Sequence, residues 1–360
     1  MQPRRFLRAA ARHVSTLPRR WAVLRGGEVR VESVSLVSTA GYALAGKVYV
    51  PEGSGGGVAE GTPPRLAPTG ASSGERGEDA SAGGGAAPGA ASTGPRPRRS
   101  PSNGDREGGR PPSAPSNTVP DPKNARFPGL VISPAIRQGL AGLEDWRSPV
   151  TPEEIARLGY VVLAYDPAGR GESWGEDDFG GPEHADDLRV AVRALRARGD
   201  VRDVAVLSLS LGLAAACAAL ATWPDEIDAR WLLDWEGPCD REIITSGGKR
   251  MAPAMGHALE DDTYWHPREA VRHVGGLRCG YVRLQAVPDH AQPAEVRHAH
   301  RMIHAAAASA TVPWFQLNDH PRGVDPARPL WHRGGTLSAN RQILAKLAEL
   351  RDAVPEGGRG

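Results

Sequence analysis

One serine stands where a buried strand would turn sharply into a helix. Ser210 follows the apolar run 204–209 (VAVLSL) and precedes an alanine-rich segment that begins LGLAAA. The small residues Ser208 and Gly212 lie two positions to either side, as a tight strand-to-helix turn requires. Such a turn would expose the Ser210 hydroxyl as a nucleophile and direct the amide of Leu211 at a developing oxyanion. The alternative is that Ser210 only caps the helix.

The segments around this serine alternate between short apolar runs and helical patterns. The predicted strands are 129–133, 160–165, 204–209, 231–234, 281–285 and 312–317. The predicted helices are 152–158, 183–197, 211–222, 293–308 and 338–350. Short runs rich in Val, Ile and Leu suit strands buried on both faces, so the alternation predicts a mostly parallel sheet with helices on both faces. In such a sheet, chemistry gathers at the carboxyl ends of the strands.

Two earlier runs complete this sheet. Segments 29–38 and 43–50 alternate apolar and polar residues and are separated by a glycine-containing turn. This pattern predicts an antiparallel hairpin. We therefore expect an α/β protein with an eight-stranded sheet.

The segment S-L-S-L-G around Ser210 resembles the nucleophile elbow of the α/β-hydrolase superfamily, which is usually G-x-S-x-G. Here Ser208 replaces the first glycine. The stretch RLGYVVLAYDPAGRGESWG (157–175) is also similar to esterase-like and peptidase-like members. The resemblance covers about 29–50 and 127–350, and it implies the α/β-hydrolase fold and a serine hydrolase that needs no cofactor. Turn formation is the main role expected within 157–175 for Asp166, Gly169, Gly171 and Ser173.

The resemblance also implies an acid and a base, because members carry serine, acid and histidine in that order along the chain. Asp289 follows strand 281–285, in a loop that looks like the superfamily's acid-bearing loop. His320 lies in NDHPRG after strand 312–317, where members carry the base. The implied triad is Ser210, Asp289 and His320, with Asp289 orienting the imidazole. A turn or helix-cap aspartate is the plainer interpretation of Asp289.

Neighbouring residues compete for both roles. Asp234 and Glu236 end the preceding strand, where some superfamily members place the acid. His290 adjoins Asp289, but we expect adjacent side chains to point apart, which favours His320 as the base.

The second oxyanion donor is expected in loop 133–139 (SPAIRQG), after the first parallel strand. Pro134 has no N–H, so the amide of Ala135 is the expected partner of the Leu211 amide, with Ile136 as the second choice. The His-Gly pair that relatives often carry here is missing.

Segment 237–266 falls where the superfamily inserts a lid. A small apolar cap and ordinary packing are equally open interpretations of the apolar residues in and beside it, which are Trp235, Met251, Met255, Tyr264 and Trp265.

Glycine and proline are concentrated in one stretch. They make up 76 of the 360 residues and 28 of the 70 residues from 51 to 120, where no residue is aromatic. Such a stretch cannot bury enough apolar surface to offset its ordering entropy. We expect a basic N-terminal segment (1–25), a single domain formed by 26–51 and 125–353, and a disordered insertion (52–124).

Composition excludes several classes of protein. A net charge of +2 gives no electrostatic case for nucleic acid or for a membrane surface. Three widely spaced cysteines indicate neither a disulfide framework nor a zinc site. His300 and His304 could share a metal ion on one helix face, but no third ligand is evident and a solvated face is expected. No apolar run predicts a membrane span, and the N-terminus lacks a secretory h-region, so a cytoplasmic protein is expected.

The resulting hypothesis is a serine hydrolase that acts on a small-molecule ester-like acyl substrate without cofactor or metal. A thioesterase or a small peptidase would use the same residues. The rival from another class is a non-catalytic binding protein with this fold. The sequence does not indicate the oligomeric state.

Overall fold

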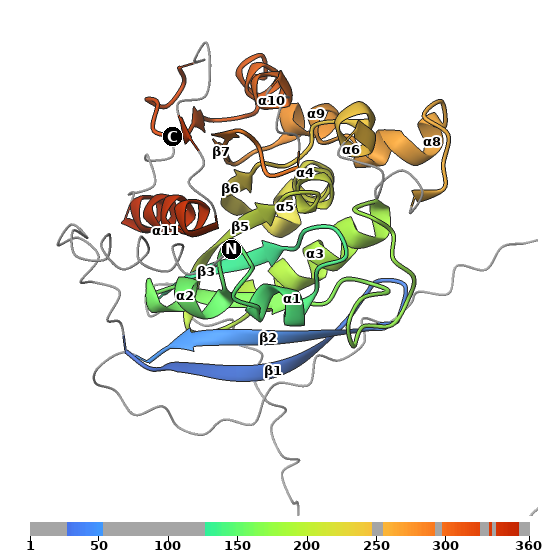
Figure 1. The fold of residues 1–360 in the computed structure, drawn as a ribbon. Coiled ribbons are helices and arrows are strands. Elements are labelled where there is room, and N and C mark those ends of the chain that lie inside the picture. The colour runs from blue at the N-terminus through green and yellow to red at the C-terminus, as the bar shows by residue number, and fades with distance from the viewer. Residues whose placement is uncertain are drawn as a thin grey trace, which may run out of the picture. The chain divides into compact units, whose positions relative to one another are not determined.

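The central sheet has eight strands in the order β1-β2-β4-β3-β5-β6-β7-β9 (Figure 1). The computed structural model describes residues 27–52, 127–246, 255–291, 297–324, 331–332 and 336–352, and these belong to one compact unit. The strands are β1 (Val29–Val37), β2 (Ala43–Pro51), β3 (Phe127–Ser133), β4 (Val161–Tyr165), β5 (Val201–Leu209), β6 (Ala229–Trp235), β7 (Gly280–Leu284) and β9 (Phe315–Leu317). The predicted eight-stranded sheet is confirmed.

Strand directions also follow the prediction. The β1–β2 hairpin is antiparallel, and β2 joins β4 in antiparallel register, while β4, β3, β5, β6, β7 and β9 run parallel. A separate short ladder pairs β8 (Ala286–Val287) with β10 (Trp331–His332). β9 begins later than the predicted strand 312–317, since Pro313 has no N–H to donate to a neighbouring strand.

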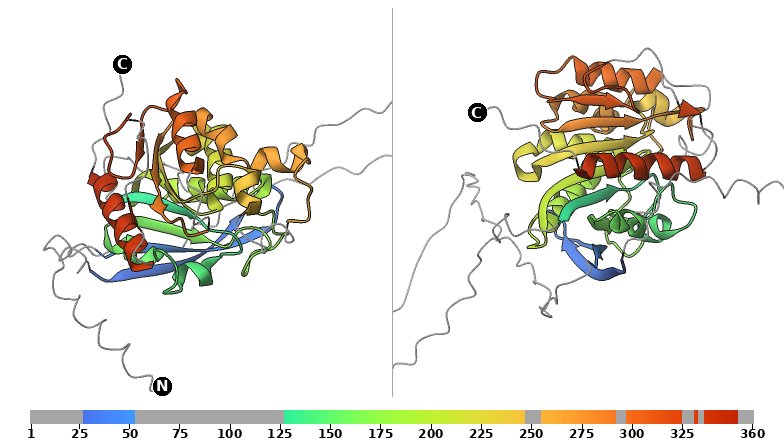
Figure 2. Two further views of the ribbon diagram at one scale, coloured as in Figure 1. Left: turned by 45° about the horizontal axis from the view of Figure 1, so that its top comes forward. Right: turned by 90° about the vertical axis from the view of Figure 1, so that its left-hand side faces the viewer.

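Helices cover both faces of the sheet (Figure 2). One face carries α3 (Pro182–Arg196), α4 (Gly212–Thr222) and α10 (Arg297–Ala307), and the other carries α1 (Leu140–Glu144), α2 (Pro152–Arg157) and α11 (Thr336–Asp352). The shorter helices are α5 (Pro224–Ile227), α6 (Arg241–Ser246), α8 (Asp262–Trp265), α9 (Ala270–His273), and the 3-10 turns His266–Arg268 and Val274–Gly276.

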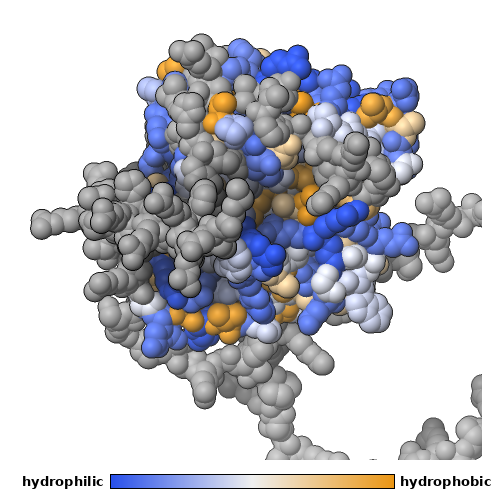
Figure 3. Space-filling model, in the orientation of Figure 1, coloured by the Kyte–Doolittle hydropathy of each residue, from blue (hydrophilic) through white to orange (hydrophobic). Residues whose placement is uncertain are grey.

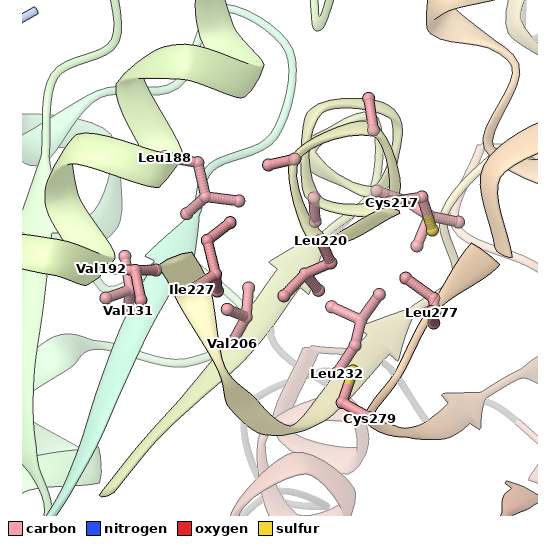
Figure 4. Close-up of a cluster of buried hydrophobic side chains, with 14 of the residues drawn as sticks. Val131, Leu188, Val192, Val206, Cys217, Leu220, Ile227, Leu232, Leu277 and Cys279 are labelled. Atoms are coloured by element: carbon pink, nitrogen blue, oxygen red, sulfur yellow. The ribbon is translucent and has the colours of Figure 1, made fainter. Parts of the chain in front are cut away.

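The alternation of side chains along β5 separates two hydrophobic cores. Val204 and Val206 pack with α3 and α4 on one face, a cluster drawn in Figure 4. Ala205 and Leu207 point the other way and pack with α2 and α11. Because successive side chains of a strand point to opposite faces, a continuous apolar run is what a doubly covered strand requires.

The surface is mainly polar. On the face shown in Figure 3, hydrophilic residues cover most of the described surface and hydrophobic residues form small patches. Among the described residues, no helix is long and apolar enough to cross a membrane. The expected basic segment 1–25, and the expected disordered insertion 52–124 except for Glu52, lie outside the described residues.

Asn318 ties the ends of β7 and β9 together. Its side chain accepts a hydrogen bond from the backbone N–H of Gln285 (2.8 Å) and donates to the carbonyl of Gln285 (3.0 Å). Asn318 is fully buried, with a left-handed φ of 52°. The loop after β9 therefore holds the backbone at the carboxyl end of β7 through these two hydrogen bonds.

Asn318→Ala should destabilise the protein, because it leaves a buried N–H and a buried carbonyl of Gln285 without partners. We expect the free energy of unfolding in urea to fall by about 2–3 kcal/mol. Asp319→Ala is the control, since that side chain is 71% exposed and Lys346, its partner at 3.4 Å, keeps the closer Glu349 at 2.6 Å. We expect it to change stability by no more than about 1 kcal/mol. Equal stabilities of the two variants would contradict the assigned role of Asn318.

Candidate active site

Ser210 lies in a left-handed turn between β5 and α4. Its φ is 51°, a conformation that residues with a side chain rarely adopt. A Cβ added at Gly212 would lie 2.3 Å from the carbonyl oxygen of Ser133 on β3, so only glycine permits this close approach of helix and strand. The predicted strand-to-helix turn is therefore present at Ser210, with small Ser208 buried beneath it.

His290 is the residue that contacts the Ser210 hydroxyl. Its Nε2 lies 2.8 Å from Oγ of Ser210, and its Nδ1 lies 2.8 Å from Oε2 of Glu236. A carboxylate only accepts hydrogen bonds, so Glu236 fixes the proton on Nδ1. That tautomer leaves Nε2 free to accept the hydroxyl proton. The arrangement has the order serine, imidazole and buried carboxylate that activates a hydroxyl nucleophile.

The Glu236 carboxylate holds the backbone of the His290 loop as well as its ring. Oε1 of Glu236 accepts the N–H of Ala286 (3.1 Å), and Oε2 accepts the N–H of His290 (2.9 Å). The side chain of Glu236 is only 1% exposed, and its φ is 50°. A buried carboxylate is stable here because these N–H groups replace its lost hydration.

His320, the predicted base, is not the histidine that contacts Ser210. His320 lies in the loop after β9, where its backbone bonds to Leu317 and Gln316, and its Nε2 is buried with no hydrogen-bond partner among the described residues. The physical reason is the path of the loop after β7. The Glu236 carboxylate accepts the backbone N–H groups of Ala286 and His290, which holds this loop across the end of β6 and places the His290 ring beside Ser210.

Asp289, the predicted acid, also lies beside His290, but its carboxylate is farther from Nδ1 than that of Glu236. Its Oδ1 is 3.4 Å from Nδ1 of His290 and accepts the N–H of Ala291 (2.7 Å). Its Oδ2 accepts from Nε2 of Gln285 (2.8 Å) and lies 3.4 Å from Nε2 of His298. Burial disfavours the ionised form, but these donors and the nearby imidazoles hold the pKa of Asp289 well below its usual range. Asp289 is thus an ionised second carboxylate next to His290.

Glu236 and His290, which the sequence favours less than Asp289 and His320, are the residues brought together with Ser210. Glu236 is the rival acid at the end of its strand. The sequence favours His320 over His290 because adjacent side chains such as those of Asp289 and His290 are expected to point apart. The signal that favours His290 is chain order, since Ser210, Glu236 and His290 also run in the order serine, acid, histidine.

Asp234, the other rival acid, is occupied elsewhere. It is fully buried, and its Oδ2 accepts from the hydroxyl of Tyr281 (2.7 Å) and from the guanidinium of Arg283. Burial and the nearby Asp234 charge raise the pKa of Tyr281 well above its usual value. Through these contacts Asp234 links β6 to β7 beneath the candidate site.

The expected oxyanion donors differ in their present contacts. Leu211 precedes the first turn of α4, where backbone N–H groups lack partners within the helix. The Ala135 N–H already donates to Oε1 of Gln138 (3.0 Å). Ile136, the second choice, lines a small cavity together with Leu211. Arg170 holds this loop by donating to the carbonyls of Ala135 (2.8 Å) and Gln138 (3.2 Å).

The predicted lid segment packs over the start of α4. Met255 and Trp265 form a buried cluster with Leu211, Ala214 and Ile244. Tyr264 packs against this cluster, and Met251 lies outside the described residues. Trp235, by contrast, lies at the end of β6 against His290.

One group of side chains has metal-ligating composition within the described part of the chain. The ligand atoms of Glu236, Asp289 and His290 lie within 4.8 Å of one another. Both ring nitrogens of His290 already have hydrogen-bond partners, Glu236 at Nδ1 and Ser210 at Nε2. These hydrogen bonds account for the close approach of Glu236 and His290. His300 and His304 on α10 are not part of such a group among the described residues.

Comparison with known proteins shows the fold. No known family's sequence model matches the chain, and no curated protein matches it. Among solved structures, it is similar to an esterase of Pyrococcus furiosus, with a TM-score of 0.51 and 12% identity over 91% of this chain and 93% of that one. It is also similar to the acylaminoacyl peptidase of Pyrococcus horikoshii, with a TM-score of 0.54 and 9% identity.

A third similar structure is a puromycin-hydrolyzing peptidase of Mycobacterium tuberculosis, with a TM-score of 0.54 and 14% identity. This chain is covered over 92% by the Pyrococcus horikoshii peptidase and over 91% by the Mycobacterium tuberculosis peptidase, but it spans only 43% and 40% of their lengths. The strand order, the strained serine turn and these similarities together establish the α/β-hydrolase fold.

Gly212→Ala should destabilise the elbow, although alanine normally favours a helix. The added Cβ would meet backbone oxygens of Ser133 and Pro134, which cannot move independently of β3. We expect a loss of about 1–3 kcal/mol in urea unfolding. Gly275→Ala is the control, because its Cβ would meet nothing closer than 3.8 Å. An unchanged stability for Gly212→Ala would show that the close approach is not needed.

Proposed function

We propose that the protein is a serine hydrolase that cleaves an ester-like acyl bond. The proposed nucleophile is Ser210, the base is His290 and the orienting acid is Glu236. The observation that carries the proposal is the continuous hydrogen-bonded line from the strained serine to a buried carboxylate, with 2.8 Å at each step. A helix cap or a turn serine needs neither partner.

In the proposed reaction, Nε2 of His290 takes the hydroxyl proton as Oγ of Ser210 attacks the acyl carbon. The imidazolium that forms is stabilised by the Glu236 carboxylate at Nδ1. It then returns the proton to the leaving group, and the acyl-enzyme remains on Ser210. The same imidazole then takes a proton from a water molecule as its oxygen attacks the acyl carbon, and the imidazolium returns that proton to Oγ of Ser210 as the bond to the acyl carbon breaks and the acid is released.

The proposed oxyanion site combines the Leu211 amide with one from loop 133–139. The Ala135 amide serves this role once Gln138 turns away, because Oε1 of Gln138 occupies its N–H. Ile136 is the other candidate donor. Two such donors would stabilise the negative oxygen in the transition state.

The proposed substrate is a small-molecule ester. Support comes from the similar structures, of which one is an esterase and two are named as peptidases. We extend hydrolysis to this chain because it shares their fold and has the hydrogen-bonded line from Ser210 through His290 to Glu236. Thioester or amide cleavage would use the same groups. A panel of p-nitrophenyl esters of increasing chain length, with a thioester and an aminoacyl amide, would distinguish these substrate classes.

A fluorophosphonate probe should label Ser210 in the folded protein, and Ser210→Ala should abolish the label. Because the base contributes to every step, His290→Gln should lower kcat by about 100- to 10,000-fold. His320→Gln is the matched control and should retain activity within a small factor. Absence of the label would favour a non-catalytic binding protein. A large loss in His320→Gln alone would restore that residue as the base.

Substitution of the two carboxylates should separate their roles. Glu236→Gln removes the negative charge that stabilises the imidazolium and replaces one accepting oxygen with an N–H₂ donor, so we expect about a 100-fold or larger loss of kcat with little change in KM. Asp289→Asn should cost less than about 10-fold, because Asp289 is the more distant carboxylate. Initial rates on one activated ester would measure both. The reverse order would assign the acid to Asp289.

A further inference from the structure

The indole of Trp235 covers one face of the His290 imidazole. The two ring centroids are 4.6 Å apart and the planes are inclined by 29°. Trp235 is itself buried, with 7% exposure, and packs in the hydrophobic core between the sheet and α11. A ring held in this way cannot turn aside, so it presents a fixed aromatic face to the imidazole.

The other restraints on His290 act in the plane of its ring. Ser210 contacts Nε2 and Glu236 contacts Nδ1, each at 2.8 Å. Hydrogen bonds at two edges allow the ring to tilt about the line that joins them. The Trp235 face opposes that tilt, which makes it the restraint perpendicular to the ring.

An unusual backbone allows consecutive residues to contact one imidazole. In a strand, successive side chains point to opposite faces, so Trp235 and Glu236 would normally diverge. The left-handed φ of 50° at Glu236 ends β6 and redirects its carboxylate. The carbonyl of Trp235 also accepts the N–H of Ser210 (3.0 Å). One dipeptide thus contacts the proposed nucleophile and base.

We propose that Trp235 is a positioning residue for His290, whose indole face fixes the ring and stabilises the imidazolium formed during catalysis. The inference rests on the proposed function for its catalytic consequence. An aromatic face attracts a cation, and tryptophan does so more strongly than phenylalanine. A neutral imidazole gains less, so the stabilisation increases as His290 accepts the serine proton.

The groups that face His290 determine in which direction the loss of the Trp235 indole shifts protonation of the imidazole. Glu236 from the β6 end, Asp289 from its own loop, Ser210 from the elbow and Trp235 surround the ring. His298 of α10 approaches only through Asp289. The carboxylates are retained in a Trp235 variant. Loss of the indole therefore removes one stabilisation of the cation and should move protonation of His290 to lower pH.

The test compares Trp235→Leu and Trp235→Phe with the wild-type protein. In Trp235→Leu, the midpoint of the acidic limb of kcat/KM should fall by about half a unit to one unit, and plateau kcat should fall by about 3- to 10-fold with KM nearly unchanged. Trp235→Phe should be intermediate in both. It retains an aromatic ring and serves if the leucine variant does not fold.

Trp231→Leu is the matched control. Trp231 lies on the same strand, is 3% exposed and packs edge-on against Tyr160, with centroids 6.5 Å apart. Its loss should lower stability comparably while leaving the midpoint and the plateau unchanged. If Trp231→Leu moves them equally, or Trp235→Leu moves neither, the proposal is overturned.

A second measurement does not depend on catalysis. The imidazole of His290 can be titrated by NMR in the wild-type protein and in Trp235→Leu. The His290 signal is identified as the one that is missing in His290→Gln. A lower midpoint in Trp235→Leu supports the inference even if no fluorophosphonate label forms on Ser210, which would remove only the hydrolase proposal. A labelled Ser210 with identical midpoints would remove the inference alone.

Discussion

The site depends on the placement of one buried carboxylate. Glu236 stands at the end of β6 and accepts hydrogen bonds from the backbone of Ala286 and from both the backbone and the ring of His290. These contacts draw the loop after β7 across the end of β6 toward β5. These hydrogen bonds hold the His290 loop next to Ser210. One side chain therefore determines both where the loop runs and which nitrogen of the imidazole carries the proton.

Backbone strain marks the same edge of the sheet. Ser210, Glu236 and Asn318 follow β5, β6 and β9, and each has a left-handed φ between 50° and 52°. Each turn redirects a side chain that a regular strand would have sent to one face or the other. The strain is sustained because each residue forms hydrogen bonds with neighbouring strands or loops. The unfavourable conformations thus coincide with the residues that assemble and support the proposed active site.

Buried polar contacts beneath this edge form a second layer. The Asp234 carboxylate pairs with Arg283, whose guanidinium also donates to Gln285, and Gln285 in turn donates to Asp289. These groups hold β6, β7 and the His290 loop in register with one another. The acids of the site therefore differ in role by their contacts: Asp234 supports strands, Asp289 lies behind the histidine, and Glu236 faces it directly.

The sequence by itself determined most of the fold and the position of the serine that we propose as the nucleophile. Apolar alternation predicts the hairpin and the parallel strands, because burial on one face or on two leaves a local pattern. Ser210 is also a local signal, since a tight turn between strand and helix demands small neighbours such as Gly212. Segments 1–25 and 53–124 lie outside the described residues, and their predicted character remains a prediction.

Only the tertiary structure decided which acid and which histidine approach that serine. Asp289 and His320 occupy the chain positions that the family resemblance favours, yet His290 and Glu236 make the contacts. The physical reason is that such a group is assembled from the ends of several strands, so its members depend on the path that each loop takes across those ends. That path is not encoded near the residue itself. The reversal of direction at Glu236, which lets adjacent Trp235 and Glu236 both reach one imidazole, leaves no periodic trace in the sequence.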